Sequence, residues 1–333
     1  YIKNILSKVY KYYMKILAVQ NRMGIGDTVI FLPFIKAVSK KFDSPISLLV
    51  KESSKADQYL DQTDYIDKII ILKRDKKSDY KHGGLLGSLN LIRDIKKHNF
   101  DKIIIFNSSL RYNLIAKLAG ISEIYQYPLF QKKKQHIIET PRILFQNKLD
   151  LIVREDPEIQ ISNKNIDQSI EKFKINKNEI NILLGIGGSG PTKRIPAETF
   201  LNVIDGMLKN KKCKFFLATG KSDDEQIILN KFLQSKFSDY CVPMDNLSIK
   251  EILPIIKNCN LSVCNDSSFS HLSAALGVKT ITLMADTPLI YGNYNSKMFP
   301  ILPDGEKSVT HNTRAKEKIN SSKILDKILE IIN

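Results

Sequence analysis

The chain of 333 residues has no tryptophan and little cysteine, with Cys213, Cys241, Cys259 and Cys264 as its four thiols. No two of them have the Cys-x-x-Cys spacing that is typical of zinc sites, and the four do not resemble a disulfide framework. The scarcity of cysteine favours a reducing, cytoplasmic setting.

Long apolar runs are also missing. No window reaches the roughly 18 uninterrupted apolar residues that a membrane-spanning helix needs. Residues 1–15 lack the apolar core and cleavage site of a secretory signal peptide. Hydrophobic residues still make up 43% of the chain, which excludes disorder over most of its length. At roughly 100–200 residues per domain, two domains are expected.

Acidic residues are fewer than basic ones: the chain has 51 Lys and Arg and 35 Asp and Glu, which gives a net charge of +16. This surplus favours anionic partners: nucleic acid, an acidic membrane or phosphorylated small molecules. An AT-rich genome would also produce a lysine-rich chain, so the charge alone does not choose among them.

Two basic segments, residues 1–15 and 131–136, bear on which anionic partner the chain binds. Residues 1–15 place apolar side chains at helical spacing with lysines off that stripe. This pattern predicts either an amphipathic helix on an anionic bilayer or a helix packed on its own domain. Residues 131–136, with the sequence QKKKQH, fit either contact with a phosphorylated glycolipid or a solvated lysine run.

Apolar runs of strand length alternate with segments of helical periodicity, which predicts parallel sheets covered on both faces. A polar stretch, with a boundary near 160–178, separates two such series. The predicted order is a basic segment (1–15), a first α/β domain (16–165), a second (175–318) and a terminal helix (319–333). Strands are predicted at 17–20, 46–50, 66–72, 101–106, 181–187, 214–220, 261–266 and 279–284; helices are predicted at 28–42, 54–60, 196–208, 223–236, 248–256 and 268–276.

Glycine turns at the carboxyl ends of these strands are where an open α/β sheet binds ligands. In the first turn, Gly24 and Gly26 precede Asp27 at the start of a helix. A carboxylate there is either an ordinary helix cap or a general base. The spacing does not match the Gly-x-Gly-x-x-Gly dinucleotide motif.

A second turn, residues 185–194, combines four glycines with Ser189, Thr192 and Lys193. Backbone amides, hydroxyls and a lysine are the groups that bind phosphate. The spacing is not that of a Walker A loop, and a flexible loop is the alternative interpretation.

The third segment, residues 265–277, is the most specific. Asp266 ends a buried strand, and the amides of Ser267, Ser268 and Phe269 open the next helix, where a diphosphate would be favoured. His271 follows one turn later, either as part of the site or as a structural histidine.

Together, the ILAVQNRMGIGDTVIFLPFIKAV, GGSGPTKRIPAETF and NDSSFSHLSAALGVKTITL segments resemble glycosyltransferase family 9, the ADP-heptose:lipopolysaccharide heptosyltransferases. The resemblance implies a GT-B fold, with two Rossmann-like domains facing across a central cleft. It implies no cofactor and no metal, and the chain has no Asp-x-Asp motif at a strand end.

The resemblance also implies roles for individual residues. Asp27 would be the general base, with Gly24, Gly26 and Arg111 on the acceptor side. The donor phosphates would lie at Ser189, Thr192, Lys193, Ser267, Ser268 and Phe269; the donor sugar and nucleotide would lie at Asp266, His271, Asp224, Glu225 and Leu247.

The implied partners are ADP-heptose or a related nucleotide sugar, a phosphorylated glycolipid acceptor and the inner-membrane surface, without nucleic acid. The family's tryptophan after the lysine loop is Ile195 here, its Asp-Thr-Gly glycine is Ser268, and its Gly-Pro-Thr is replaced by residues 285–288. Another nucleotide sugar is therefore one alternative. A non-catalytic module that binds nucleotide sugar or RNA is another.

Overall fold

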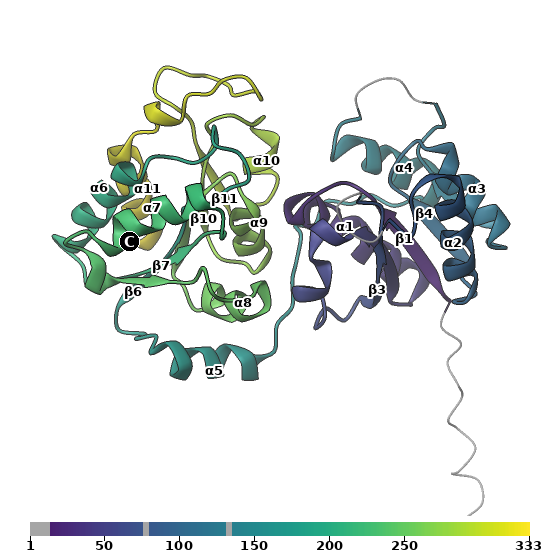
Figure 1. Ribbon diagram of the computed structural model, residues 1–333, viewed down its shortest axis with the longest axis horizontal. Helices are drawn as coiled ribbons and strands as arrows, with labels where there is room; N and C mark the ends of the chain where they lie inside the picture. The colour runs from purple at the N-terminus through teal and green to yellow at the C-terminus, as the bar shows by residue number, and fades with distance from the viewer. Residues whose placement is uncertain (1–13, 76–79, 131–134) are drawn as a thin grey trace, which may run out of the picture. The chain divides into compact units, whose positions relative to one another are not determined.

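The computed structural model describes residues 14–75, 80–130 and 135–333, and it contains two separate parallel sheets (Figure 1). The chain divides into two compact units. Of the described residues, the first unit comprises those within 14–23, 31–54 and 64–154, and the second comprises 24–30, 55–63 and 155–333. Both predicted basic segments lie wholly or mostly outside the described residues.

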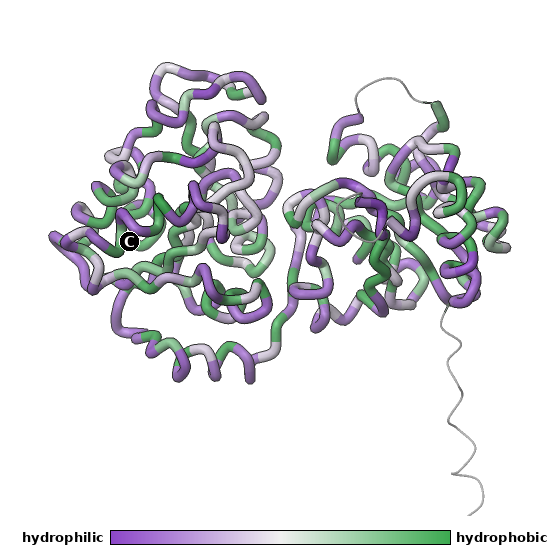
Figure 2. Tube along the Cα trace, viewed as in Figure 1, coloured by the Kyte–Doolittle hydropathy of each residue, from purple (hydrophilic) through white to green (hydrophobic). Residues whose placement is uncertain are grey.

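The first sheet has five parallel strands in the order β3-β2-β1-β4-β5. The residues at its centre are buried and mostly apolar, since helices cover both faces of the sheet. Figure 2 shows the corresponding stretches of the trace in green. The strands are β1 (Ile16–Gln20), β2 (Ile46–Lys51), β3 (Ile66–Leu72), β4 (Lys102–Ile105) and β5 (Glu123–Gln126).

Helices α2 (Gly84–Lys96) and α3 (Leu110–Leu118) cover one face of this sheet. Their apolar side chains join one core cluster with those of β1 and β4. On the other face, Phe34 packs edge-on against Phe145, with ring centroids 5.2 Å apart. These two aromatic residues belong to α1 (Ile25–Phe42) and α4 (Glu139–Leu149).

The second sheet has six parallel strands in the order β11-β10-β9-β6-β7-β8. The chain first builds β6, adds β7 and β8 on one side, and then crosses to place β9 on the other side. The carboxyl ends of β6 and β9 therefore meet at the point where the strand order reverses. The strands are β6 (Ile180–Gly185), β7 (Cys213–Ala218), β8 (Cys241–Pro243), β9 (Leu261–Asn265), β10 (Thr280–Leu283) and β11 (Met298–Ile301).

Three helices of the second unit, α5, α8 and α11, begin at a residue whose side chain accepts a bond from a backbone amide of the first turn. Ser248 accepts a bond from the amide of Glu251, whose side chain accepts one from the Ser248 amide, so that a capping box starts α8. The helices are α5 (Asn163–Phe173), α6 (Ala197–Leu208), α7 (Asp223–Leu233), α8 (Ile249–Lys257), α9 (Ser268–Ala275), α10 (Ile290–Asn293) and α11 (Ser321–Ile332).

The predicted strands are all present, with small shifts at their ends. Helix α1 starts at Ile25, three residues earlier than predicted, because its first turn includes the Gly26-Asp27 pair. The helix predicted at 54–60 is instead two short 3₁₀ turns, Glu52–Ser54 and Ala56–Gln58. No helix among the described residues is long and apolar enough to cross a membrane.

All four cysteines are free thiols buried in the second unit. Burial raises the pKa of Cys213 and of Cys241 to about 11. It raises the pKa of Cys264 to about 12. These thiols serve as small apolar core residues.

Candidate functional site

The candidate site lies at the carboxyl ends of β6 and β9, where the strand order of the second sheet reverses. The glycine-rich loop 186–195 follows β6, and Asp266 follows β9 directly. The sheet therefore brings together two motifs that lie about 75 residues apart in the chain, as expected for this class of sheet.

Asn265 joins the two motifs. Its buried side-chain amide donates to the carbonyl oxygens of Ile186 and Gly187, at 2.8 and 3.1 Å. Its carbonyl oxygen accepts a bond from the Ile195 amide at 3.3 Å. One side chain thus holds both ends of the glycine-rich loop, because it satisfies backbone groups that would otherwise be buried unpaired.

Gly187 is required by close packing. A Cβ atom there would lie 2.6 Å from Oε1 of Glu225 and 2.9 Å from the backbone Cα of Thr219. At Gly190 the nearest atom would be 3.8 Å away. The start of the loop is therefore fixed against the β7–α7 turn, whereas its tip is open.

Lys193 and Asp266 form an ion pair, with Nζ 2.8 Å from Oδ2. The carboxylate is 5% exposed and the lysine 26%. Burial would raise the pKa of Asp266. The charge and hydrogen bond of Lys193, together with the neighbouring His271 and Thr287, outweigh this effect and hold that pKa below its usual value. Asp266 is therefore ionised at neutral pH. The Lys193 side chain remains partly exposed to solvent.

His271 is buried beside this pair. Its Nδ1 is 2.7 Å from the Tyr294 hydroxyl, and its Nε2 is 4.0 Å from Oδ1 of Asp266. Burial lowers the pKa of His271 to about 4, although the charge of Asp266 opposes the shift. The imidazole is therefore neutral at pH 7 and stacks on the Tyr294 ring.

The start of α9 presents amides to the same site. Ser267 caps the helix with extended backbone but no side-chain capping bond. Its hydroxyl is buried and has no partner among the described residues. The first amides of a helix, here those of Ser268 and Phe269, have no partner within the helix and carry the positive end of its dipole. An anion would satisfy both the hydroxyl and the amides.

Comparison with known proteins shows the family to which the chain belongs. The model of glycosyltransferase family 9 (heptosyltransferase) matches residues 88–327, which is well over half of the chain. The chain belongs to this family. The match includes the glycine-rich loop and Asp266 but begins after Asp27.

Individual relatives agree. The chain is 23% identical over 326 residues to lipopolysaccharide heptosyltransferase 1 of Campylobacter coli, covering 87% of this chain and 90% of that one. It resembles E. coli ADP-heptose LPS heptosyltransferase II with a TM-score of 0.74 at 15% identity, covering 96% and 98% of the two chains. It resembles E. coli heptosyltransferase WaaC solved with ADP with a TM-score of 0.69 at 16% identity, covering 96% and 100%. The fold is GT-B, with two Rossmann-like domains.

The acidic residues after β7 differ in what they contact. Glu225, which the family resemblance assigned to the nucleotide, accepts bonds from the amides of Gly188 and Gly220 and from the Ser222 hydroxyl. Asp224 is largely exposed and pairs with Arg194 at 2.8 Å. Glu225 thus fixes the two loops, while Asp224 faces solvent.

Three further residues that the resemblance assigned to the donor differ in their exposure. Ser189 is exposed at the loop tip, and Thr192 and Leu247 are half-buried. Thr219 was not singled out by the sequence, yet its hydroxyl is buried and has no partner among the described residues. A lone threonine before a glycine carries no signal that sequence patterns could use.

Asp27 lies in the first turn of α1, directly after β1, and is half-buried. Gly24 has a φ of +95°, a conformation that glycine adopts without strain. The Thr28 hydroxyl donates to the Gly24 carbonyl at 3.2 Å and closes the turn. The turn is thus a local structure that holds a carboxylate at the start of a helix.

A polar network that the sequence did not reveal lies at the point where the strand order of the first sheet reverses, between β1 and β4. Asn107 donates to the Asn21 side chain at 3.1 Å, and Asn21 donates to the Tyr112 hydroxyl at 3.4 Å. Arg111 is half-buried and donates to the His82 carbonyl at 2.5 Å. Burial and the nearby charge of Arg74 lower the pKa of Arg111.

The described residues contain no group of three or more His, Cys, Asp or Glu side chains that could hold a metal ion. The groups at this site that can attract an anion include the ammonium group of Lys193 and the backbone amides at the start of α9.

Proposed function

We propose that this family 9 enzyme is an inverting heptosyltransferase that transfers heptose from ADP-heptose to a lipopolysaccharide core acceptor, either Kdo-lipid A or an already heptosylated core. The acceptor is a phosphorylated glycolipid at the cytoplasmic face of the inner membrane. The reaction needs no metal ion. ADP-heptose enters the proposal because relatives of similar fold were solved with ADP and with an ADP-2-deoxy-2-fluoro heptose.

The observation that carries the proposal is the ion pair between the buried Asp266 and the partly exposed Lys193, which joins the glycine-rich loop to the start of α9. This arrangement supplies a cation, a partnerless Ser267 hydroxyl and helix amides at one place. Such groups would bind a diphosphate and stabilise the negative charge that develops on it as it leaves.

The proposed chemistry is a single displacement. An acceptor hydroxyl oxygen bonds to C1 of the sugar while the bond from C1 to the diphosphate oxygen breaks. ADP leaves with the electron pair of that bond, and Asp27 takes the hydroxyl proton. Because attack and departure occur on opposite sides of C1, the anomeric configuration inverts.

The replacement of Asp27 by Asn tests the base. We expect transfer to fall by a factor of about 10² to 10⁴ because the amide cannot take the proton, while ADP binding stays unchanged. Glu139→Gln is the matched control, since Glu139 also lies in the first turn of a helix, α4. Transfer at the parent rate by Asp27→Asn would remove Asp27 from the mechanism.

The donor is tested by thermal shift with ADP-, GDP- and UDP-sugars, followed by the mass of the product on Kdo-lipid acceptor. A gain of one heptose supports the proposal. Preference for a GDP- or UDP-sugar would favour the alternative donor, which the changed sequence at residues 285–288 keeps open. RNA binding that nucleotide sugar does not displace would favour the non-catalytic alternative.

A further inference from the structure

An exposed apolar surface lies on the outside of α2 and α3 in the first unit. Of the eight leucines that are largely exposed among the described residues, six belong to these two helices. We call this surface the leucine face; its residues are Leu85, Leu86, Leu89, Leu110, Leu114 and Leu118.

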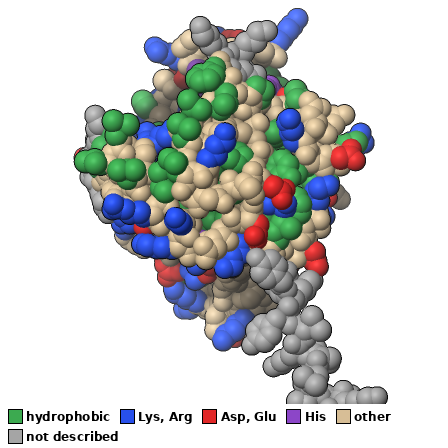
Figure 3. All heavy atoms as spheres, turned by 90° about the vertical axis from the view of Figure 1, so that its right-hand side faces the viewer, with side chains coloured by type: hydrophobic (Ala, Val, Ile, Leu, Met, Phe, Trp, Pro, Cys, Tyr) green, Lys and Arg blue, Asp and Glu red, His purple; other side chains and the backbone are tan. Residues whose placement is uncertain are grey.

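The six leucines lie on one side of the unit. Both helices bury their opposite sides, including Leu91 of α2 and Ile115 of α3, in the same core cluster beneath the sheet. The two helices also contact each other. In α3 the exposed leucines recur every four residues and therefore form a single stripe. Figure 3 shows apolar side chains gathered on this side of the unit, with lysines and arginines among them.

The exposure is large for side chains of this type. Leu85 is 89% exposed, Leu86 is 78% and Leu118 is 64%. Soluble proteins rarely leave contiguous apolar patches in water, and such patches mark sites of association with proteins or membranes.

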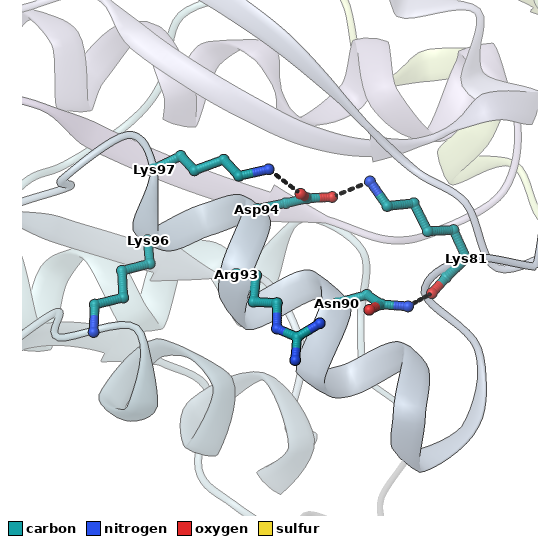
Figure 4. A pocket seen from close by; sticks show the side chains of 6 residues that line it. All are labelled: Lys81, Asn90, Arg93, Asp94, Lys96 and Lys97. Atoms are coloured by element: carbon teal, nitrogen blue, oxygen red, sulfur yellow. Dashed lines mark hydrogen bonds and ion pairs between the residues drawn. The ribbon is translucent and has the colours of Figure 1, made fainter.

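The C-terminal half of α2 is basic. A hollow of about 530 Å³ is lined by Lys81, Asn90, Arg93, Asp94, Lys96 and Lys97. In Figure 4, Lys81 and Lys97 point to Asp94, whereas Arg93 and Lys96 extend away from it. Arg93, Lys96 and Lys117 of the two helices are exposed, and the sequences of α2 and α3 contain one acidic residue, Asp94.

The basic residues favour a lipid bilayer over a second copy of the chain as the partner of the leucine face. If two copies packed face to face, the basic cluster of one copy, which includes Arg93, Lys96 and Lys117, would lie close to the basic cluster of the other. Repulsion between these like charges disfavours such a dimer. An anionic bilayer complements both features, because leucines enter the boundary of headgroups and acyl chains while lysines and arginines meet the phosphates.

We propose that the leucine face, with the basic residues of α2, docks this enzyme onto an anionic lipid bilayer. The inference deepens the proposed function, because a glycolipid acceptor resides in a membrane. Vesicle binding needs neither donor nor acceptor, so it can succeed or fail independently of heptosyl transfer.

The test is sedimentation of the full chain with vesicles of phosphatidylethanolamine and phosphatidylglycerol, and with vesicles of phosphatidylcholine alone. We expect binding to the anionic vesicles that weakens as salt is raised. Leu86→Gln/Leu114→Gln should reduce binding at least tenfold, because each buried leucine contributes about a tenfold factor. Ile143→Gln/Ile227→Gln, which removes two isoleucines of similar exposure on α4 and α7, should bind like the parent.

The charges are tested in the same way. Arg93→Gln/Lys96→Gln should weaken binding by about 25-fold, because each basic residue near an anionic surface contributes roughly a fivefold factor. Lys211→Gln/Lys212→Gln removes two exposed charges of the second unit and should have little effect.

A fluorescent probe gives a second readout, because the chain has no tryptophan. The emission of Leu86→Trp should shift to the blue on anionic vesicles, and that of Ile227→Trp should not. Parent-level vesicle binding by Leu86→Gln/Leu114→Gln would overturn the proposal. A second outcome would also overturn it: the parent protein forms a dimer in analytical ultracentrifugation, and the double leucine variant is monomeric but binds vesicles like the parent.

Discussion

Asp266 and His271 are neighbours that are held in different charge states. Lys193 keeps the Asp266 carboxylate ionised inside the protein. Burial keeps the His271 imidazole neutral, 4.0 Å from that carboxylate. The consequence is a site whose net charge before ligand binding is close to zero, so that an added diphosphate is not repelled.

The neutral histidine predicts how stability depends on pH. Its folded-state pKa of about 4 lies below the ordinary value of 6.5, so the unfolded chain takes up a proton first as the pH falls. The free energy of unfolding should therefore decrease between pH 6.5 and 4, by on the order of 3 kcal/mol. Denaturant unfolding at several pH values measures this, and His271→Gln should flatten the curve. An equally steep curve in that variant would assign the effect to other groups.

Lys193→Ala should cost both ligand affinity and stability. Without the amine, Asp266 is a buried charge without its ion-pair partner, which should cost about 2 kcal/mol after allowing for the partial exposure of the lysine. ADP affinity, measured by calorimetry, should fall at least tenfold.

The double variant Lys193→Ala/Asp266→Asn separates the two effects. Removing the buried charge should restore stability but not ADP affinity. If the double variant bound ADP like the parent, Lys193 would have no role at the phosphates.

At the scale of elements, the predictable features were those that burial imposes on sequence. Central strands such as β1, with the sequence ILAVQ, and β4, with the sequence KIII, are nearly continuous apolar runs because both faces of the sheet are covered. Two edge strands lack that signal and were not predicted: β5 has the sequence EIYQ, and β8 has three residues. The edge strand β3, with the sequence IDKIIIL, was predicted because it keeps an apolar run. Helices α2 and α3 were not predicted, because leucines on their outer faces blur the helical periodicity.

The candidate site was predictable to a similar extent. Glycines, Lys193 and Asp266 form motifs within short stretches of sequence. The roles of Asn265 and Glu225 depend on bonds to segments that lie far away or on another loop. Such roles appear only when the sheet brings these segments together.

The glycine-rich loop predicts two contrasting substitutions. Gly187→Ala should destabilise the second unit by about 2 kcal/mol, because its Cβ would meet backbone that cannot move freely. Gly190→Ala should change stability little, because nothing lies within 3.8 Å. Chemical denaturation of both variants measures the change in the free energy of unfolding. Similar decreases at the two positions would contradict the packing described for the loop.

At the scale of the whole molecule, the two units have separate cores. The cluster around β1 and β4 and the cluster around β6 and β9 consist of different residues. Units with their own cores can unfold separately.

This organisation predicts the response to ligand. ADP should raise the unfolding temperature of the second unit only, by an amount that corresponds to about 2.7 kcal/mol at a concentration of 100 times Kd. Differential scanning calorimetry with and without ADP measures this. An equal shift of both transitions would mean that the units unfold together.

The burial of every thiol has a practical consequence. Because Cys213, Cys241, Cys259 and Cys264 are all inside the second unit, maleimide reagents should leave the native enzyme unmodified. A single cysteine introduced on each unit would then be labelled without background. The separation between the two dyes, followed by energy transfer as donor and acceptor are added, would report how the halves of this enzyme move during a catalytic cycle.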